Sequence, residues 1–201
     1  MVKVKPNPPK STVALRLKEK KLAQIAKVIS TCAICQHNKS GKAVAGEGNA
    51  NADIVFLGEA PGKEEAKTGR PFVGRAGKLL RGLLSDIGIN PEDVYITSPV
   101  KYLPDYVTPT LEDITHGKTH LEAQLKVIEP KVIVLMGNVA AIAVLGEKIP
   151  IAQKHGEIIN QNGRHYFLSY HPAAPLYSPK LREVIKKDFV KLKKFLLAFS
   201  V

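Results

Sequence analysis

The chain has 201 residues, of which 44% are hydrophobic, and its 30 Lys and Arg outnumber 18 Asp and Glu to give a net charge of +12. This length and apolar content suit one domain with its own core, and the lack of an 18-residue apolar run argues against a transmembrane helix and a membrane partner. The positive charge favours a polyanionic partner, most simply nucleic acid, with a merely solvated basic surface as the alternative.

The N-terminal residues and the cysteines indicate the cellular compartment. Residues 1–10 are basic and proline-rich, lack the apolar segment of a signal peptide, and are expected to be disordered. The two cysteines lie together as Cys32-Ala33-Ile34-Cys35, which is too few for a disulfide framework. We therefore expect a cytoplasmic protein in which Cys32 and Cys35 have a metal or redox role.

Hydrophobic periodicity divides residues 11–201 into helices and strands. Ser11 is a suitable N-cap for the first helix, whose apolar side would consist of Val13, Leu17, Ile25, Val28 and Ile29. The expected helices cover about 12–29, 76–87, 111–128, 138–145 and 179–199, the expected strands 53–57, 94–97, 132–136 and 166–170, and a hairpin-like region 149–163.

Strands that alternate with helices predict a parallel sheet covered by helices on both faces. We therefore expect an α/β fold, a three-layer α/β/α sandwich with a central, mainly parallel four-stranded sheet. No internal repeat or interdomain linker interrupts the pattern, so residues 11–201 are expected to form a single domain after the short N-terminal segment.

The stretch 53–77 is where we expect the chemistry. Its apolar run breaks at Gly58-Glu59-Ala60-Pro61-Gly62, because two glycines and a proline continue neither a strand nor a helix. A carboxylate and Phe72 are thereby held in a loop at the carboxyl end of a strand, where open α/β sheets bind ligands. The loop is neither G-x-G-x-x-G nor a P-loop, so it does not predict nucleoside triphosphate binding.

Four segments carry a family resemblance: GEAPG at 58–62, TGRPFVGRAG at 68–77, PKVIVLMG at 130–137 and YHPAA at 170–174. With all four in order, the chain resembles the family 4 uracil-DNA glycosylases, the iron–sulfur branch of that superfamily, from Thr31 to its last helix. The resemblance implies a uracil-DNA glycosylase-like fold and a base excision repair enzyme that flips uracil out of DNA. Such an enzyme hydrolyses the N-glycosidic bond, stabilises the leaving uracil anion and leaves an abasic site.

The resemblance also implies a base pocket. Phe72 would stack on the base, with an ordinary core position as its alternative. His171 would donate a hydrogen bond to uracil O2 as negative charge develops there, with a merely exposed strand-end histidine as the alternative. Backbone groups of the first loop would bind the base carbonyls or a flanking phosphate. The loop residues assigned to base binding are Gly58, Ala60, Pro61 and Gly62.

Glu59 and Glu65 match acidic positions of the family and, with His171, are the expected catalytic residues. Either carboxylate could orient the attacking water or stabilise the oxocarbenium-like sugar, as carboxylates do in glycoside chemistry. The sequence does not choose between the two. No lysine nucleophile is implied, so we expect a monofunctional glycosylase.

Residues 172–177 resemble the loop that family members insert into the DNA minor groove. Leu176 would be an apolar wedge between base steps, and a place in the core is its alternative. Basic residues of the last helix would meet phosphates, which makes binding salt-dependent. The residues expected to contact DNA are Arg75, Pro172, Ala173, Ala174 and Leu176.

The chain departs from the family at the uracil-reading asparagine, which is replaced by Ser98. An amide both donates and accepts hydrogen bonds, whereas a hydroxyl is shorter and offers one donor. We assign Ser98 to base binding and expect an altered specificity or rate, so that hypoxanthine becomes an alternative base.

A second departure concerns the [4Fe–4S] cluster that the family holds with four cysteines. Cys32 and Cys35 match the first two, but the other two positions align with Tyr102 and Gly117. We expect the cluster to be lost or altered and no cofactor to be required for the chemistry. The alternative is a mixed metal site that adds two histidines near these positions, His37 and His116.

Three functions follow in order of preference. The first is a monomeric glycosylase acting on uracil-containing DNA. The second is a catalytically weak or altered-specificity homologue that acts as a damaged-DNA-binding module. The third is a small metal or redox protein built on Cys32 and Cys35.

Overall fold

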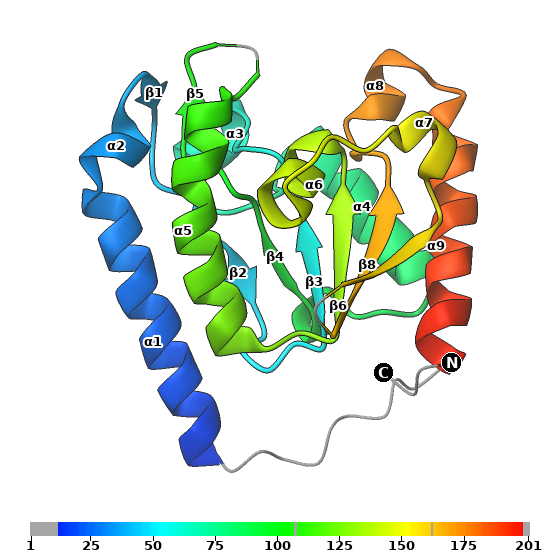
Figure 1. Ribbon diagram of the computed structural model, residues 1–201, viewed down its shortest axis with the longest axis horizontal. Helices are drawn as coiled ribbons and strands as arrows, with labels where there is room; N and C mark the ends of the chain where they lie inside the picture. The colour runs from blue at the N-terminus through cyan, green and yellow to red at the C-terminus, as the bar shows by residue number, and fades with distance from the viewer. Residues whose placement is uncertain (1–11, 107, 162, 199–201) are drawn as a thin grey trace.

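The structure is a computed structural model that describes residues 12–106, 108–161 and 163–198 (Figure 1). The disorder expected for residues 1–10 and the N-cap expected at Ser11 lie outside these ranges. Within them, no helix is both long enough and apolar enough to cross a membrane.

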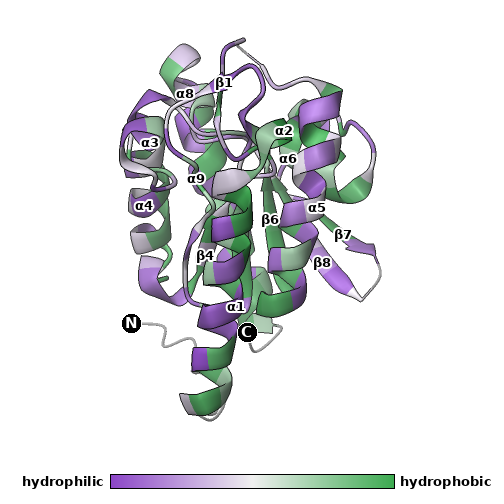
Figure 2. Cartoon of the chain, turned by 90° about the vertical axis from the view of Figure 1, so that its left-hand side faces the viewer, coloured by the Kyte–Doolittle hydropathy of each residue, from purple (hydrophilic) through white to green (hydrophobic). Residues whose placement is uncertain are grey.

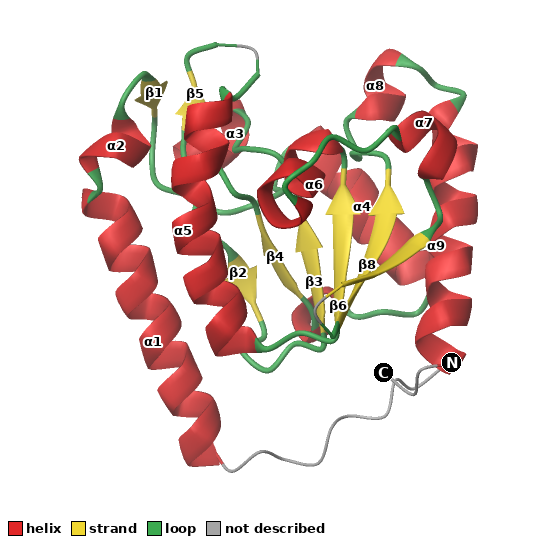
Figure 3. Ribbon diagram, in the orientation of Figure 1, coloured by secondary structure: helices red, strands yellow, loops and turns green. Residues whose placement is uncertain are grey.

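A six-stranded sheet forms the centre of the fold (Figure 3). Its strand order is β2-β4-β3-β6-β8-β7, and the four inner strands run parallel. The α/β class and the mainly parallel sheet predicted from the sequence are therefore confirmed. The inner strands are β3 (Ile54–Leu57), β4 (Tyr95–Thr97), β6 (Val132–Met136) and β8 (Arg164–Ser169).

The expected number of four strands is wrong, because a short antiparallel strand pairs with each edge of the parallel set. β2 (Glu47–Gly48) pairs with β4, and β7 (Ile158–Gln161) pairs with β8. The hairpin expected over 149–163 is therefore only partly correct, because residues 151–154 form a helix and β7 pairs with the strand that follows this range. β2 has two residues, and its Gly48 has a φ of 130°. A strand this short carries no alternating pattern, so periodicity could not predict it.

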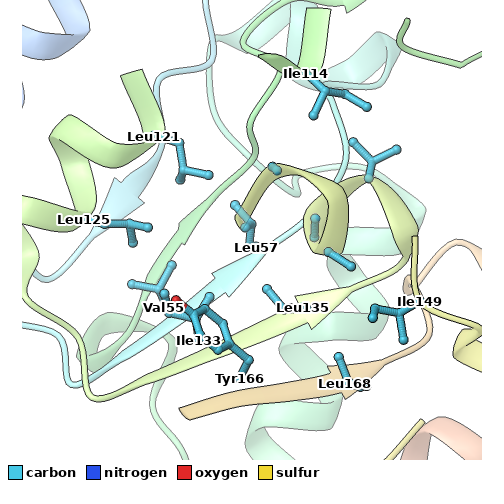
Figure 4. Close-up of a cluster of buried hydrophobic side chains, with 14 of the residues drawn as sticks. Val55, Leu57, Ile114, Leu121, Leu125, Ile133, Leu135, Ile149, Tyr166 and Leu168 are labelled. Carbon is cyan, nitrogen blue, oxygen red and sulfur yellow. The ribbon is translucent and has the colours of Figure 1, made fainter. Parts of the chain in front are cut away.

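Both faces of the sheet are buried. Along β3, Val55 and Leu57 belong to one hydrophobic cluster, whereas Ile54 and Phe56 belong to the other. Every residue of β3 and β6 is buried, which is the pattern of parallel strands covered on two faces. Figure 4 shows the first cluster, in which Leu121 of a covering helix packs with the strand side chains.

Helices cover the two faces and complete the three layers (Figure 1). α5 (Leu111–Ile128) and α6 (Asn138–Leu145) pack on the first cluster, and α4 (Arg75–Asp86) and α9 (Leu181–Ala198) pack on the second. α5 begins at a capping box in which Thr110 and Asp113 exchange side-chain-to-backbone hydrogen bonds, which explains why its start was predictable.

α1 (Thr12–Thr31) lies along α5 rather than on the sheet. Of its expected apolar side only Ile29 is fully buried, whereas Val13, Leu17 and Val28 are exposed, and part of this apolar surface is visible in Figure 2. The expected apolar side is therefore wrong at these three positions. A helix that packs on a single neighbour buries a narrower stripe than one that covers a sheet.

Several short elements have no periodic signal because they span two to six residues. The charged segment after Gly62 is helix α3 (Lys63–Thr68), and the expected DNA loop contains helix α8 (Ala174–Tyr177). The remaining short elements are α2 (Ala33–Gln36), the 3₁₀ turn η1 (Pro91–Asp93), α7 (Ile151–Lys154) and a separate two-stranded sheet of β1 (Lys39–Ser40) with β5 (Leu103–Pro104).

Because the four inner strands are parallel, their carboxyl ends meet at one edge of the sheet, the upper edge in Figure 1. The loop after β3 and the loop after β8 therefore lie at the same end of the molecule, although more than a hundred residues separate them in sequence. The sequence-predicted site residues of both loops meet there.

Two glycines of α4 differ in what surrounds them. A Cβ at Gly77 would lie 1.6 Å from the carbonyl oxygen of Phe72, whereas a Cβ at Gly82 would meet nothing within 4 Å. We predict that Gly77→Ala lowers the free energy of unfolding by more than about 1 kcal/mol, whereas Gly82→Ala raises it by up to ~1 kcal/mol through helix propensity. Urea denaturation of both variants checks this, and equal stabilisation by the two substitutions would contradict it.

Candidate active site

A cavity of ≈ 260 Å³ lies at the carboxyl ends of β3 and β8. This volume is slightly below the ~300–1,000 Å³ typical of small-molecule sites, which suits a single planar ring system. The predicted catalytic residues, most of the predicted base-binding residues and one predicted DNA-contacting residue line it. Those that do are Glu59, Ala60, Pro61, Gly62, Glu65, Phe72, His171 and Ala173.

Phe72 is held in an unusual backbone conformation by close packing. Its φ is 51°, in the left-handed region that side-chain-bearing residues rarely adopt. Its carbonyl lies against Gly77, where no side chain could fit, and its ring contacts Gly58, where an added Cβ would lie 2.7 Å from the ring. The two glycines thus fix the ring at the cavity wall, with its centroid 5.7 Å from that of His171.

His171 presents a hydrogen-bond donor to this region. Its Nδ1 lies 3.1 Å from the backbone N–H of Ala173, which must donate, so Nδ1 is unprotonated and Nε2 carries the hydrogen of the neutral ring. Nε2 is buried and has no hydrogen-bond partner in the described part of the chain. Burial lowers the pKa of His171 to about 4, so the ring is neutral at physiological pH.

The two candidate carboxylates have different surroundings. Glu65 lies on α3, and its Oε1 accepts a hydrogen bond of 2.8 Å from the backbone N–H of Gly74, the N-cap of α4. Glu59 accepts no hydrogen bond from the residues that the structure describes, and burial raises its pKa above the usual value. Glu65 is therefore anchored to the protein, whereas the Glu59 carboxylate is available to a ligand.

Ser98 is buried and does not line the cavity. Its hydroxyl donates a hydrogen bond of 2.8 Å to the carbonyl oxygen of Val100, so its only donor is used within its own loop. Gly58 does not line the cavity either, because it lies behind the ring of Phe72.

The residues predicted to contact DNA are spread over the rim of this end of the molecule. Leu176 is 38% exposed on α8, so the alternative that it occupies the core is wrong. Arg75 is exposed at the first residue of α4, Ala173 and Ala174 are partly exposed, and Pro172 is buried. Helix α9 runs from α8 toward the opposite end of the sheet, so only its first turns lie at the upper edge, where the inner strands end (Figure 1).

A [4Fe–4S] cluster is held by four thiolates. The whole chain has two cysteines, so the residues at the family's cluster positions do not fit such a cluster. Tyr102 is buried against Cys35, and its hydroxyl donates to the carbonyl oxygen of Ser30 at 3.2 Å. At Gly117 an added Cβ would lie 2.3 Å from the carbonyl oxygen of Pro99, so a cysteine has no room there.

Cys32 and Cys35 nevertheless have histidine neighbours. His116 and His120 of α5 lie with them, and the donor atoms of all four are within 4.8 Å of one another. The alternative metal site, in which His37 and His116 join the two cysteines, is therefore wrong about His37, which is exposed and is not part of this group.

Sequence reasoning missed residues that close the cavity on the side of β5. They come from the proline- and aromatic-rich segment after β4, whose composition was the available signal, and from the start of α4. These residues are Ala76, Leu103, Pro104, Tyr106 and Pro109.

Lys101 was also missed. It is 1% exposed, and its ammonium donates to Gln124 Oε1 at 2.7 Å, Thr97 Oγ1 at 2.8 Å and the carbonyl oxygen of Ala45 at 3.1 Å. Burial lowers the pKa of Lys101 to about 7. The residue ties the end of β4 to α5 and to the segment before β2, and no sequence signal distinguishes it from a surface lysine.

Comparison with known proteins shows the family of the chain. The profile of the Uracil DNA glycosylase superfamily matches residues 45–196. The chain is 40% identical to the type-4 uracil-DNA glycosylase of Archaeoglobus fulgidus over 181 residues, which cover 85% of this chain and 91% of that protein. It is 40% identical to the type-4 enzyme of Thermotoga maritima over 89% of this chain and 96% of that protein. A type-5 uracil-DNA glycosylase of Pyrobaculum aerophilum is 34% identical over 66% of each chain.

The carboxyl edge of the parallel sheet thus carries a glycine-rich loop, a fixed aromatic ring and a neutral histidine. The match to the family profile covers most of the length of the chain. The chain belongs to the uracil-DNA glycosylase superfamily. The resemblance inferred from its four motif segments is confirmed.

The lowered pKa of His171 has a consequence for stability. The unfolded chain binds a proton at this residue below about pH 6.5, whereas the folded protein does so only near pH 4, so acidification across this window favours unfolding. We predict that the free energy of unfolding falls less between about pH 7 and about pH 5 in His171→Asn than in the unsubstituted protein. Urea denaturation at the two pH values measures the difference, since other titrating groups are common to both proteins; equal falls would contradict the prediction.

Proposed function

We propose that this protein is a monofunctional DNA glycosylase that hydrolyses the N-glycosidic bond of uracil in DNA and leaves an abasic site. The observation that carries the proposal is the buried Nε2–H of neutral His171, which has no partner within the described chain and lies beside the fixed ring of Phe72. A buried donor without a partner costs stability, so its retention indicates a ligand that accepts the hydrogen bond. The names of the type-4 relatives support uracil in DNA as the substrate.

The cavity supports a mechanism of base capture. A uracil flipped out of the duplex would stack on Phe72 and receive a hydrogen bond from His171 at O2. When the bond from C1′ to N1 breaks, its electron pair passes to the base, and the negative charge reaches O2. A donor already aimed at that oxygen stabilises the anion without reorganisation, an effect worth roughly 3–4 kcal/mol in comparable sites.

Glu59 is the carboxylate that we assign to the sugar side. Water adds to C1′ of the oxocarbenium-like sugar, and Glu59 would orient it and accept its proton. The raised pKa of Glu59 makes it a better base than an exposed carboxylate, and its oxygens accept no bond from the described residues. Glu65 instead acts as a positioning residue, because its bond to Gly74 holds α3 against the start of α4, next to Phe72.

A broader base specificity is a second candidate function, favoured by Ser98. Its hydroxyl donates to Val100 and lies outside the cavity, so no side-chain amide or hydroxyl at this position reads the uracil edge. Hypoxanthine is the alternative base. A homologue that binds damaged DNA without cleaving it is the other alternative, and one assay distinguishes all three.

We predict that the protein releases uracil from a labelled oligonucleotide and that the strand breaks only after alkali. His171→Asn should lower the single-turnover rate by about 10²–10³, because asparagine retains an acceptor for the Ala173 N–H but lacks the Nε2 donor. The exposed His37→Asn is the matched control and should leave the rate unchanged.

Parallel reactions with uracil and hypoxanthine oligonucleotides measure base choice. Retention of uracil-containing DNA in a gel shift without base release would support the binding module and overturn the enzyme. An unchanged rate in His171→Asn would remove the role assigned to this histidine.

Leu176 is assigned to the space that the flipped nucleotide vacates. We predict that Leu176→Ala slows uracil release from duplex DNA by about tenfold, equivalent to roughly 1.4 kcal/mol, and has little effect on single-stranded DNA, where no stack must be opened. Leu197→Ala is the control, since Leu197 is an exposed leucine near the far end of α9. Equal slowing on the two substrates would contradict a wedge.

A further inference from the structure

Two segments far apart in sequence bring four potential metal ligands together beside the N-terminal helices. Cys32 is the N-cap of α2, and Cys35 is buried within α2. His116 and His120 are one turn apart on α5, so their side chains share one face of that helix. The ligand atoms of all four lie within 4.8 Å of one another.

We infer that Cys32, Cys35, His116 and His120 bind a single zinc ion. The site stands where related enzymes are expected to hold an iron–sulfur cluster, but its donor set and nuclearity differ. Two thiolates and two imidazoles in a tetrahedral arrangement are a donor set of structural zinc sites, and the spacings C-x₂-C and H-x₃-H fall within the usual ranges.

The distances favour one ion over a cluster. With zinc–sulfur bonds of about 2.3 Å and zinc–nitrogen bonds of about 2.0–2.1 Å, the ligand atoms of a tetrahedral site are about 3.3–3.8 Å apart. Cys32 Sγ and His116 Nε2 already lie 3.2 Å apart. A two-iron centre with the same residues would separate the cysteine pair from the histidine pair, because each pair would ligate a different iron.

The group also shows unmet bonding capacity. Nε2 of His120 is buried and has no hydrogen-bond partner among the described residues, although its ring packs edge-on against His116 at 5.3 Å between centroids. A buried nitrogen without a partner is costly unless something binds it, and a cation among two sulfurs and a second imidazole supplies that bond.

The role of the ion is structural. All four positions are taken by protein side chains, which leaves no open position for water or substrate, and none of the four lines the base cavity. The ion joins α2, which directly follows α1, to the middle of α5. This cross-link holds the N-terminal helices to the sandwich, which they otherwise contact mainly through α5.

Metal analysis of the full-length protein, expressed in zinc-containing medium and purified without chelators, tests the inference. We expect about one zinc per chain and no stoichiometric iron or acid-labile sulfide. After exchange with Co²⁺, the visible spectrum should show the intense d–d bands of tetrahedral cobalt and the near-ultraviolet band of thiolate-to-cobalt charge transfer. These two measurements use the unsubstituted protein, so they do not depend on whether a variant folds.

Variants then identify the ligands. His116→Asn and His120→Asn should each weaken zinc binding by about a hundredfold or more in competition with a chromophoric chelator, whereas His37→Asn should retain the zinc affinity of the unsubstituted protein.

Iron with sulfide, a metal-free Cys32–Cys35 disulfide, or a cobalt spectrum without thiolate charge transfer would each overturn the inference. So would zinc affinity that is unchanged in both histidine variants. None of these readouts involves base release, so they are independent of the proposed enzymatic activity.

Discussion

The packing of Phe72 between Gly58 and Gly77 is the constraint on which the candidate site depends. The carbonyl of Phe72 occupies the space that a side chain at Gly77 would need, and the ring of Phe72 occupies the space that a side chain at Gly58 would need. These contacts hold a residue with a φ of 51° that would otherwise relax to the right-handed or extended region. They also couple the start of α4 to the loop after β3, so one packing interaction shapes two walls of the cavity.

His171 completes the site from the other end of the chain. It follows β8, whose pairing with β6 in the parallel sheet brings it to the edge where β3 ends. Its Nδ1 is occupied by the N–H of Ala173, which fixes the tautomer, and burial keeps the ring neutral. The result is a donor that is oriented and desolvated before any ligand arrives. This preorganisation is the property that stabilises a developing anion most effectively.

Much of the fold and part of the site could be predicted from residues alone. Continuous apolar runs at Ile54–Leu57 and Val132–Met136 predict strands buried on both faces, and a capping box at Thr110 marks the start of α5. Short elements such as β2 and α8 have no period to detect. Ser98 illustrates a different limit: its residue type predicts a weaker base contact, but only the bond to Val100 reveals that its hydroxyl faces away from the cavity.

By itself, the sequence determined the layer architecture, the motif loops and the choice of Glu59, Phe72 and His171 as candidate site residues, because periodicity and local turn chemistry act between neighbours in the chain. Tertiary structure alone decided which carboxylate is anchored, since Glu65 meets Gly74 only when α3 packs against α4. It also decided that His116 and His120, rather than His37, join Cys32 and Cys35. About eighty residues separate these pairs, and no local pattern spans that distance; only the packing of α5 beside α1 and α2 brings them together.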